Sequence, residues 1–348
     1  MGPERFQPFQ TNVTTRHFPK GGKPIERNDR SNGEHSATAD TAAPSDPARS
    51  RHLALIEQAK TLPPLRTAVV FPVDAVSLAG AMDAAEAGLI EPVLIGPPAS
   101  IRAAAAAAHV SHKSFEIAEA DTGVASAERA VALAASGDVG ALMKGDLHTD
   151  ILMEAVISGT PNLKTERRIS HVFVFDVPRY PKHLLITDAA INIYPDLETK
   201  RDIVQNAIDL AHAIGMGTPR VAILSAVETV TPRIRSTIEA AALCKMTDRE
   251  QITGAIVDGP LAFDNAVNLK AARIKHIHSP VAGRADVLVV PDLEAGNMLA
   301  KQLEYLVGAE AAGVVLGARV PIILTSRADS AKRRDWHLRL LLSCCAGR

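Results

Sequence analysis

The chain has 348 residues and a formal net charge of −1, with 47% hydrophobic, 22% charged and 3% aromatic residues. These proportions are those of a globular protein and exclude a chain that is disordered throughout. The near-neutral charge does not indicate binding to nucleic acid or to an acidic membrane surface. At this length we expect two domains, with cores built mainly from Ala, Val, Ile and Leu.

Targeting and metal-binding signals are weak. The cysteines, Cys244, Cys344 and Cys345, form neither a CxxC pair nor a zinc spacing, so no disulfide framework is indicated. His276 and His278 have no acidic partner at a spacing typical of a metal site, and we expect no metal. No run of 18 apolar residues occurs, and the first ten residues lack the apolar region of a signal peptide. These features favour a cytoplasmic protein.

Residues 1–50 differ in composition from the rest of the chain. They contain six prolines and many Ser, Thr and Asn residues, and they show almost no apolar periodicity. Such a segment buries too little apolar surface to offset the conformational entropy that ordering costs. We therefore expect residues 1–50 to be a disordered N-terminal extension.

From about residue 51 onward, short β-branched segments alternate with segments of helical period. One helical face runs from Val204 to Ile214 and ends before Gly215. Strands are expected at 67–71, 92–95, 140–143, 172–175, 184–187, 221–224, 255–257, 287–290 and 321–324. This alternation requires crossover connections and predicts an α/β fold with largely parallel strands, and two such sheets would account for the chain.

Most of these expected strands run directly into polar residues, of which the clearest are Asp74, Lys144, Asp188, Ser225 and Asp292. Parallel α/β sheets bind ligands outside the carboxyl ends of their strands, where the amides of the following helices suit phosphate. We therefore expect these residues to gather at one edge that forms the site. Each residue taken singly is also a common helix N-cap.

The usual nucleotide and hydrolase motifs do not occur. No GxGxxG follows an expected strand, and neither GxxxxGK[ST] nor GxSxG is present. Dinucleotide, P-loop and nucleophile-elbow sites are therefore disfavoured.

Several other segments resemble the phosphate acetyl/butyryltransferase family. The resemblance spans roughly residues 53–330 and rests on five collinear motifs and a terminal Ser-Arg motif: LMKGDLHTDILMEAV at 142–156, HLLITDAAINIYPDLETK at 183–200, VAILSAVETV at 221–230, GAIVDGPLAFDNAV at 254–267, SPVAGRADVLVVPDLEAGN at 279–297 and TSRADS at 325–330. The family resemblance implies two α/β/α domains of the isocitrate/isopropylmalate dehydrogenase-like type, with mostly parallel sheets and an interdomain cleft. The first domain would comprise residues 51–160 completed by 314–348, and the second residues 161–313.

The same resemblance implies an acyl transfer between coenzyme A and phosphate, with coenzyme A as a substrate and no tightly bound cofactor. It also implies a homodimer that acts on small molecules, without nucleic acid or membrane as a partner. The family's Ser-Arg motif matches Ser326 and Arg327, which makes Arg327 the candidate phosphate anchor and Ser326 its hydrogen-bonding partner. Asp329 is the candidate general base, and a helix N-cap is the alternative for this residue.

Five further residues are candidates for binding CoA, phosphate or acyl phosphate: Lys144, Gly145, Ser225, Glu228 and Asn297. The alternative role of Lys144, Ser225 and Glu228 is a helix cap or an ion pair. The alternative role of Asn297 is to hold a loop together.

The segment after Ser330 departs from the family pattern. It carries five Lys or Arg residues against one Asp and contains the chain's tryptophan, Trp336. A genuine variant helix and a shifted reading frame both account for it. Two other functions stay open at this point: a metal- and NAD-dependent decarboxylating dehydrogenase of the same fold, and a non-catalytic two-domain protein that binds an anion.

Overall fold

The computed structural model describes residues 62–110 and 115–324. The expected extension at 1–50 and the segment after Leu324 lie outside these described residues, as do Ser326, Arg327 and Asp329. The fold described below therefore concerns the part of the chain between Leu62 and Leu324.

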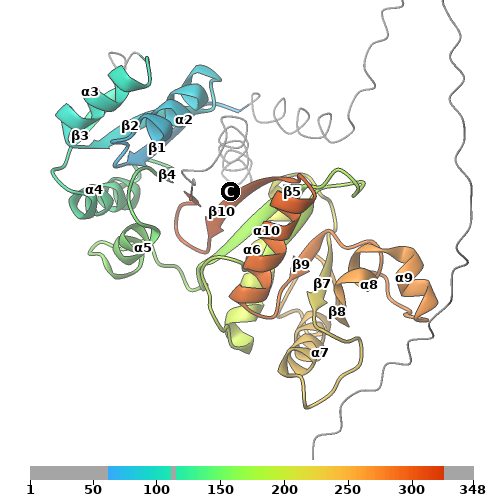
Figure 1. Ribbon diagram of the computed structural model, residues 1–348. Helices are drawn as coiled ribbons and strands as arrows, with labels where there is room; N and C mark the ends of the chain where they lie inside the picture. The colour runs from blue at the N-terminus through green and yellow to red at the C-terminus, as the bar shows by residue number, and fades with distance from the viewer. Residues whose placement is uncertain (1–61, 111–114, 325–348) are drawn as a thin grey trace, which may run out of the picture. The chain divides into compact units, whose positions relative to one another are not determined.

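One sheet of eleven strands organises the fold, in the order β3-β2-β1-β4-β11-β10-β5-β6-β9-β7-β8 (Figure 1). The strands are β1 (Leu65–Val70), β2 (Ile90–Gly96), β3 (Glu116–Glu119), β4 (Ala141–Lys144), β5 (Ser170–Asp176), β6 (Leu184–Thr187), β7 (Arg220–Leu224), β8 (Ile256–Leu261), β9 (Val287–Val289), β10 (Glu310–Leu316) and β11 (Ile322–Ile323). The helices are α2 (Ala75–Glu86), α3 (Pro98–Ala107), α4 (Gly123–Ser136), α5 (Thr149–Ser158), α6 (Leu197–Ala213), α7 (Arg235–Asp248), α8 (Phe263–Val267), α9 (Leu269–Ile274) and α10 (Leu293–Leu306).

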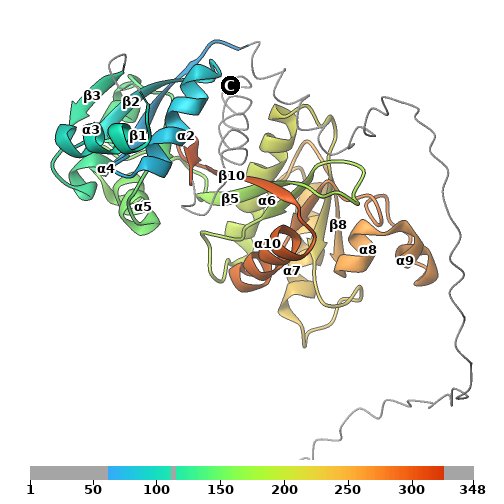
Figure 2. The same cartoon turned by 45° about the horizontal axis from the view of Figure 1, so that its top comes forward.

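Helices cover both faces of the strands. In the first part of the chain, alternate residues of β1 point to opposite faces: Val70 packs with α4 and α5, and Val69 packs with α2 and α3. In the later part, α6 and α7 cover one face of β5, β6, β7 and β9, and α8, α9 and α10 pack on the other. Helices α8 and α9 lie side by side just after β8 (Figure 2). The structure thereby confirms the expected α/β class.

Helix α6 shows how the sequence sets these elements. Asp196 accepts a hydrogen bond from the amide of Thr199 at 2.8 Å and so caps the start of the helix. The predicted face of Val204, Ala207 and Ile208 is fully buried, and Gly215 follows the helix with a φ of 81°. None of the helices that the structure describes is long and apolar enough to cross a membrane.

The strand pairing differs from the expectation in two ways. The two expected sheets are joined into one through β10 and β11, which pair at Val315 and Ile322. Three successive pairs, β11–β10, β10–β5 and β5–β6, are antiparallel, and the remaining pairs are parallel. Because three reversals separate β4 from β6, these two strands run in opposite directions. The expectation of one common edge for all strand ends is therefore wrong, and the ends form two groups.

Candidate functional site

The first group of strand ends contains Lys144 and Gly145. Lys144 is the last residue of β4 and is buried, and its ammonium donates hydrogen bonds to the carbonyl oxygens of Gly145 at 3.0 Å and Leu147 at 3.1 Å. The positive charge of Lys144 is therefore held at the turn that follows β4.

Gly145 lies where the end of β4 packs against the end of β1. Its amide donates to the carbonyl oxygen of Val70 at 2.8 Å, and the next amide, that of Asp146, donates to the carbonyl oxygen of Phe71 at 2.8 Å. A Cβ atom added at Gly145 would lie 2.5 Å from the oxygen of Val70 and 2.6 Å from that of Phe71. Only glycine fits this approach without moving backbone, so Gly145 sets the spacing of the turn after β4.

The strand β11 brings the C-terminal part of the described chain to the same place. Ile322 pairs with Leu142 and Ile323 with Met143, both in parallel register, so that Leu324 follows β11 at the level where Lys144 ends β4. The described chain ends there, two residues before Ser326 and three before Arg327.

The second group of strand ends contains Ser225, which follows β7. Its amide donates to the carbonyl oxygen of Leu261 at 2.9 Å, and its buried hydroxyl shares a hydrogen bond of 2.9 Å with the hydroxyl of Ser236. Ser225 therefore ties the end of β7 to the first turn of α7.

Glu228 lies on the loop between β7 and α7. It accepts hydrogen bonds from the ammonium of Lys275 at 2.8 Å and from the side-chain amide of Asn265. The hydrogen bond from Lys275 is the main cause that lowers the pKa of Glu228 below its usual range. The carboxylate thereby fastens this loop to α8 and to the end of α9.

We expect Glu228→Gln to lower the unfolding temperature at pH 7 by at most about 3 °C, because a partly exposed ion pair contributes less than about 1 kcal/mol. A lowered carboxylate pKa stabilises the fold above the unfolded pKa of about 4.3, and this contribution is lost as the pH falls through the folded pKa. The difference between variant and parent should therefore shrink from pH 7 to pH 4 in calorimetric unfolding. Glu128→Gln, at an exposed position of α4, is the control. An equal penalty at both pH values would assign the effect to packing instead of charge.

Asn297 lies on the exposed side of the first turns of α10. Its amide nitrogen donates to the carbonyl oxygen of Ala189 at 3.2 Å, in the loop after β6. In the same loop Asp188 is buried and accepts hydrogen bonds from the amides of Ala190, Ile191 and Asn192, while burial raises its pKa. Asn297 therefore holds this loop, and its contact with a ligand stays a prediction.

A charged cluster that sequence reasoning missed lies beside Ser236. The ammonium of Lys200 and the guanidinium of Arg235 both contact the carboxylate of Glu239, each at 2.5 Å. Lys200 and Glu239 are buried, whereas the side chain of Arg235 is 70% exposed. The cluster borders a cavity of about 220 Å³, which Ser236 and Asp292 also line.

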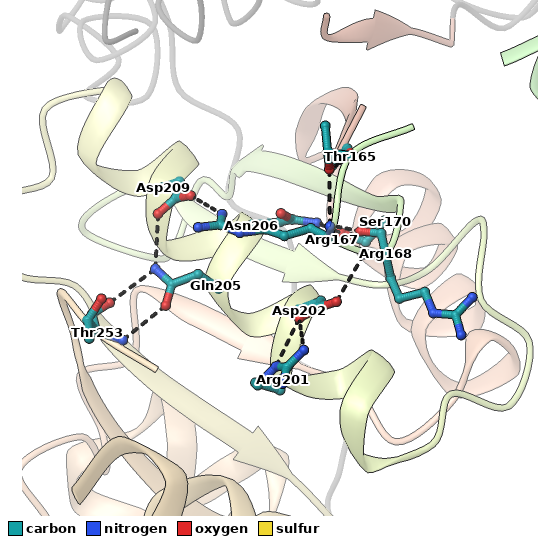
Figure 3. Close-up of polar contacts among 11 residues, drawn as sticks. Thr165, Arg167, Arg168, Ser170, Arg201, Asp202, Gln205, Asn206, Asp209 and Thr253 are labelled. Atoms are coloured by element: carbon teal, nitrogen blue, oxygen red, sulfur yellow. Dashed lines mark hydrogen bonds and ion pairs between the residues drawn. The ribbon is translucent and has the colours of Figure 1, made fainter. Parts of the chain in front are cut away.

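The charge of Arg235 in this cluster also acts on the carboxylate of Asp196. Its pKa is lowered first by the hydrogen bond from the amide of Thr199, and additionally by the charges of Arg168 and Arg235. In Figure 3 the guanidinium of Arg168 points away from the network that holds its backbone, in which the Arg168 amide donates to Asp202 at 3.0 Å. Cationic groups from two other segments, Arg168 before β5 and Arg235 in α7, therefore lie near the start of α6.

A larger cavity of about 740 Å³ lies beside the C-terminal half of α6, next to Thr165 and Gly317. Thr165 donates to the carbonyl oxygen of Gly317 at 2.6 Å. Arg167 forms an ion pair with Asp209, and Asn206 donates to Ser170 at 2.9 Å (Figure 3). The described candidate residues do not line this cavity.

Comparison with known proteins gives the family. Residues 109–334 match the model of the phosphate acetyl/butaryl transferase family. The chain is 61% identical over 285 residues to a phosphate acetyltransferase from Rhizobium meliloti, covering 82% of this chain and 90% of the relative. It is 37% identical over 276 residues to a phosphate butyryltransferase from Clostridium acetobutylicum, covering 79% of this chain and 92% of the relative.

The fold agrees with this assignment. A branched-chain phosphotransacylase from Enterococcus faecalis superimposes with a TM-score of 0.71 and 28% identity, covering 81% of this chain and 99% of that chain. Strand order, family motifs and sequence identity thus lead to one conclusion: the chain is a member of the phosphate acetyl/butyryltransferase family.

Proposed function

We propose that this chain interconverts acyl-CoA and phosphate with acyl phosphate and CoA, for acetyl or a short acyl group such as butyryl. The observation that carries the proposal is the 61% identity to a phosphate acetyltransferase over 82% of the chain. Lys144 adds a buried positive charge at the end of β4, beside the strand that leads to Ser326 and Arg327, and anionic reactants require such a charge.

The proposed step is a direct displacement. The thiolate sulfur of CoA attacks the carbonyl carbon of the acyl phosphate, so that a C–S bond forms, the C–O bond to phosphate breaks, and phosphate leaves with the bonding electrons. The thiol proton goes to a base, for which we propose Asp329. A free thiol with a pKa of about 8.5 is only a few per cent ionised at neutral pH. Such a base therefore raises the rate of the reaction about 10²–10⁴-fold.

We propose that Arg327 grips two phosphate oxygens with its planar guanidinium and that Ser326 donates a hydrogen bond to the carbonyl or phosphate oxygen. Arg327 follows Leu324 by three residues in the sequence, and Leu324 lies beside Lys144 at the end of β4. Lys144 and Gly145 are proposed to bind the phosphates of CoA or the acyl phosphate there. Alignment of the two reactants supplies the larger part of the rate enhancement, about 7–11 kcal/mol.

Ser225, Glu228 and Asn297 are proposed to form a second wall of the site. Glu228 and Asn297 each keep a side-chain oxygen besides the atom committed to the fold, and we expect them to bind through it. The hydroxyl of Ser225 can both donate and accept, so we expect it to bind beside its hydrogen bond to Ser236. We propose further that CoA is bound as a substrate, that no tightly bound cofactor takes part because direct displacement requires none, and that the chain acts as a cytoplasmic homodimer.

The deciding experiment follows acyl-CoA formation from CoA with acetyl, propionyl or butyryl phosphate. We expect turnover with at least one of the three, and the ratio of their kcat/KM values identifies the preferred chain length. Turnover should persist after dialysis against a metal chelator and without NAD. Phosphate binding without any turnover would instead support a non-catalytic anion-binding protein, and strict dependence on a metal ion and NAD would support the dehydrogenase alternative.

A further inference from the structure

The cavity beside Lys200 lies where a parallel sheet offers a ligand site. It is bordered by the loops that follow β6 and β9, through Tyr194 and Asp292, and by the first turn of α7, through Ser236. Its volume of about 220 Å³ equals that of several water molecules at about 30 Å³ each, which leaves room for a phosphoryl group but not for a whole nucleotide.

The charged side chains of this cavity hold more hydrogen-bond donors than acceptors. An ammonium carries three N–H groups and a guanidinium five, and Lys200 and Arg235 share one carboxylate, that of Glu239. The Nε–H of Arg235 is used by this carboxylate at 2.5 Å, so its two terminal nitrogens have no hydrogen-bond partner among the described residues. The other acid at the cavity, Asp292, is committed to the amide of Ala295 at 2.9 Å as the cap of α10.

A neutral hydroxyl, that of Ser236, also lines the cavity. The hydroxyl of Ser236 shares its hydrogen bond with Ser225 and lies one residue after Arg235, in the first turn of α7. The buried ammonium of Lys200 is fixed by Glu239, so it faces the cavity without the entropy cost of an exposed lysine. A buried cation, a forked cation and a hydroxyl around one small cavity match the chemistry of an oxyanion.

We propose that Lys200, Arg235 and Ser236 form a phosphoryl-binding subsite for one of the phosphorylated reactants. This assignment deepens the proposed acyl transfer and rests on it for the identity of the ligand. The phosphoryl group belongs either to acyl phosphate and inorganic phosphate or to CoA, and the two sources share the same oxyanion chemistry. Arg235 supplies the fork, and Lys200 supplies the fixed charge at the base of the cavity.

The test compares Arg235→Gln and Ser236→Ala with Arg233→Gln, which removes an exposed arginine two residues away that does not line the cavity. Calorimetric titration gives the affinity for inorganic phosphate and for CoA, and steady-state assays give the KM of acyl phosphate and of CoA. Arg235→Gln should weaken one phosphorylated reactant about tenfold, Ser236→Ala should weaken the same reactant less, and Arg233→Gln should stay within about twofold of the parent. The side chain of Arg235 is mostly exposed, so the variant should keep its fold and its unfolding temperature.

The outcomes separate the two sources. Weaker phosphate binding with a higher KM for acyl phosphate assigns the subsite to the acyl phosphate, and weaker CoA binding with a higher KM for CoA assigns it to a CoA phosphate. Unchanged affinities and KM values in Arg235→Gln, or equal losses in Arg233→Gln, overturn the subsite. A parent chain without turnover would contradict the proposed acyl transfer, while the titrations with phosphate and CoA would still decide the subsite.

Discussion

Replacing Gly145 by alanine is expected to lower both stability and turnover, because the new methyl group would meet backbone oxygens that cannot rotate away. The Cβ would lie 2.5 Å from the oxygen of Val70 and 2.6 Å from that of Phe71. Relief of this overlap requires β1 and the turn after β4 to separate, which costs about 1–3 kcal/mol as in an overpacked core. The ammonium of Lys144, which is bonded to the Gly145 carbonyl, would shift with the turn. A displacement of about 1 Å in a site costs on the order of 100-fold in rate, so we expect kcat to fall at least tenfold.

Gly123→Ala is the matched control for this change. Its Cβ would lie 3.7 Å from Leu147 and 3.9 Å from Phe71, both ordinary contacts, and Gly123 begins α4. We expect this variant to match the parent in turnover and to be equally or slightly more stable, since alanine suits a helix better than glycine. Chemical unfolding and the acyl transfer assay measure both variants. If Gly145→Ala matched Gly123→Ala in both measurements, the turn after β4 would be neither tightly packed nor part of the site.

The sequence predicted most of the elements because their residues are both apolar and β-branched. All nine expected strands occur, and 184–187 has the observed bounds of β6. The helical face from Val204 to Ile214 is buried as its period indicates. Short β-branched segments between helical ones predict strands well, because strands of this kind are buried on both faces and therefore consist almost wholly of apolar residues.

Two strands were missed, and their residues explain why. Strand β10 reads EAAGVVL, and its alanines and glycine have low β-propensity; it is nevertheless strand because β5 pairs with it along seven residues. Strand β3 has four residues at the edge of the sheet, two of them glutamates. Without β10, the reversal of direction between β4 and β6 could not be inferred, and this led to the mistaken single edge of strand ends.

The candidate site was predictable where polar residues follow strands, and harder to predict where charges lie inside helices. Lys144, Ser225 and Glu228 were proposed because they stand at or after the ends of apolar strands, and their contact with a substrate stays a prediction. Lys200 was not, although it stands four residues before Val204, on the buried face of α6. A lysine on the apolar face of one helix and a glutamate, Glu239, on the apolar face of the next helix together predict a buried ion pair, because buried charges require partners.

We expect Arg327→Lys to lower kcat/KM by at least 100-fold, equivalent to about 2.7 kcal/mol, although the positive charge is retained. Lysine offers a single point charge, whereas guanidinium binds two phosphate oxygens with parallel N–H donors. The loss should appear both in the KM for phosphate and in kcat, since the grip on the leaving phosphate matters in the bound complex and in the transition state. Arg333→Lys, six residues further along the chain, is the control and should change neither constant. Values of kcat and of the phosphate KM within about threefold of the parent, under about 1 kcal/mol, would show that Arg327 is not the phosphate anchor.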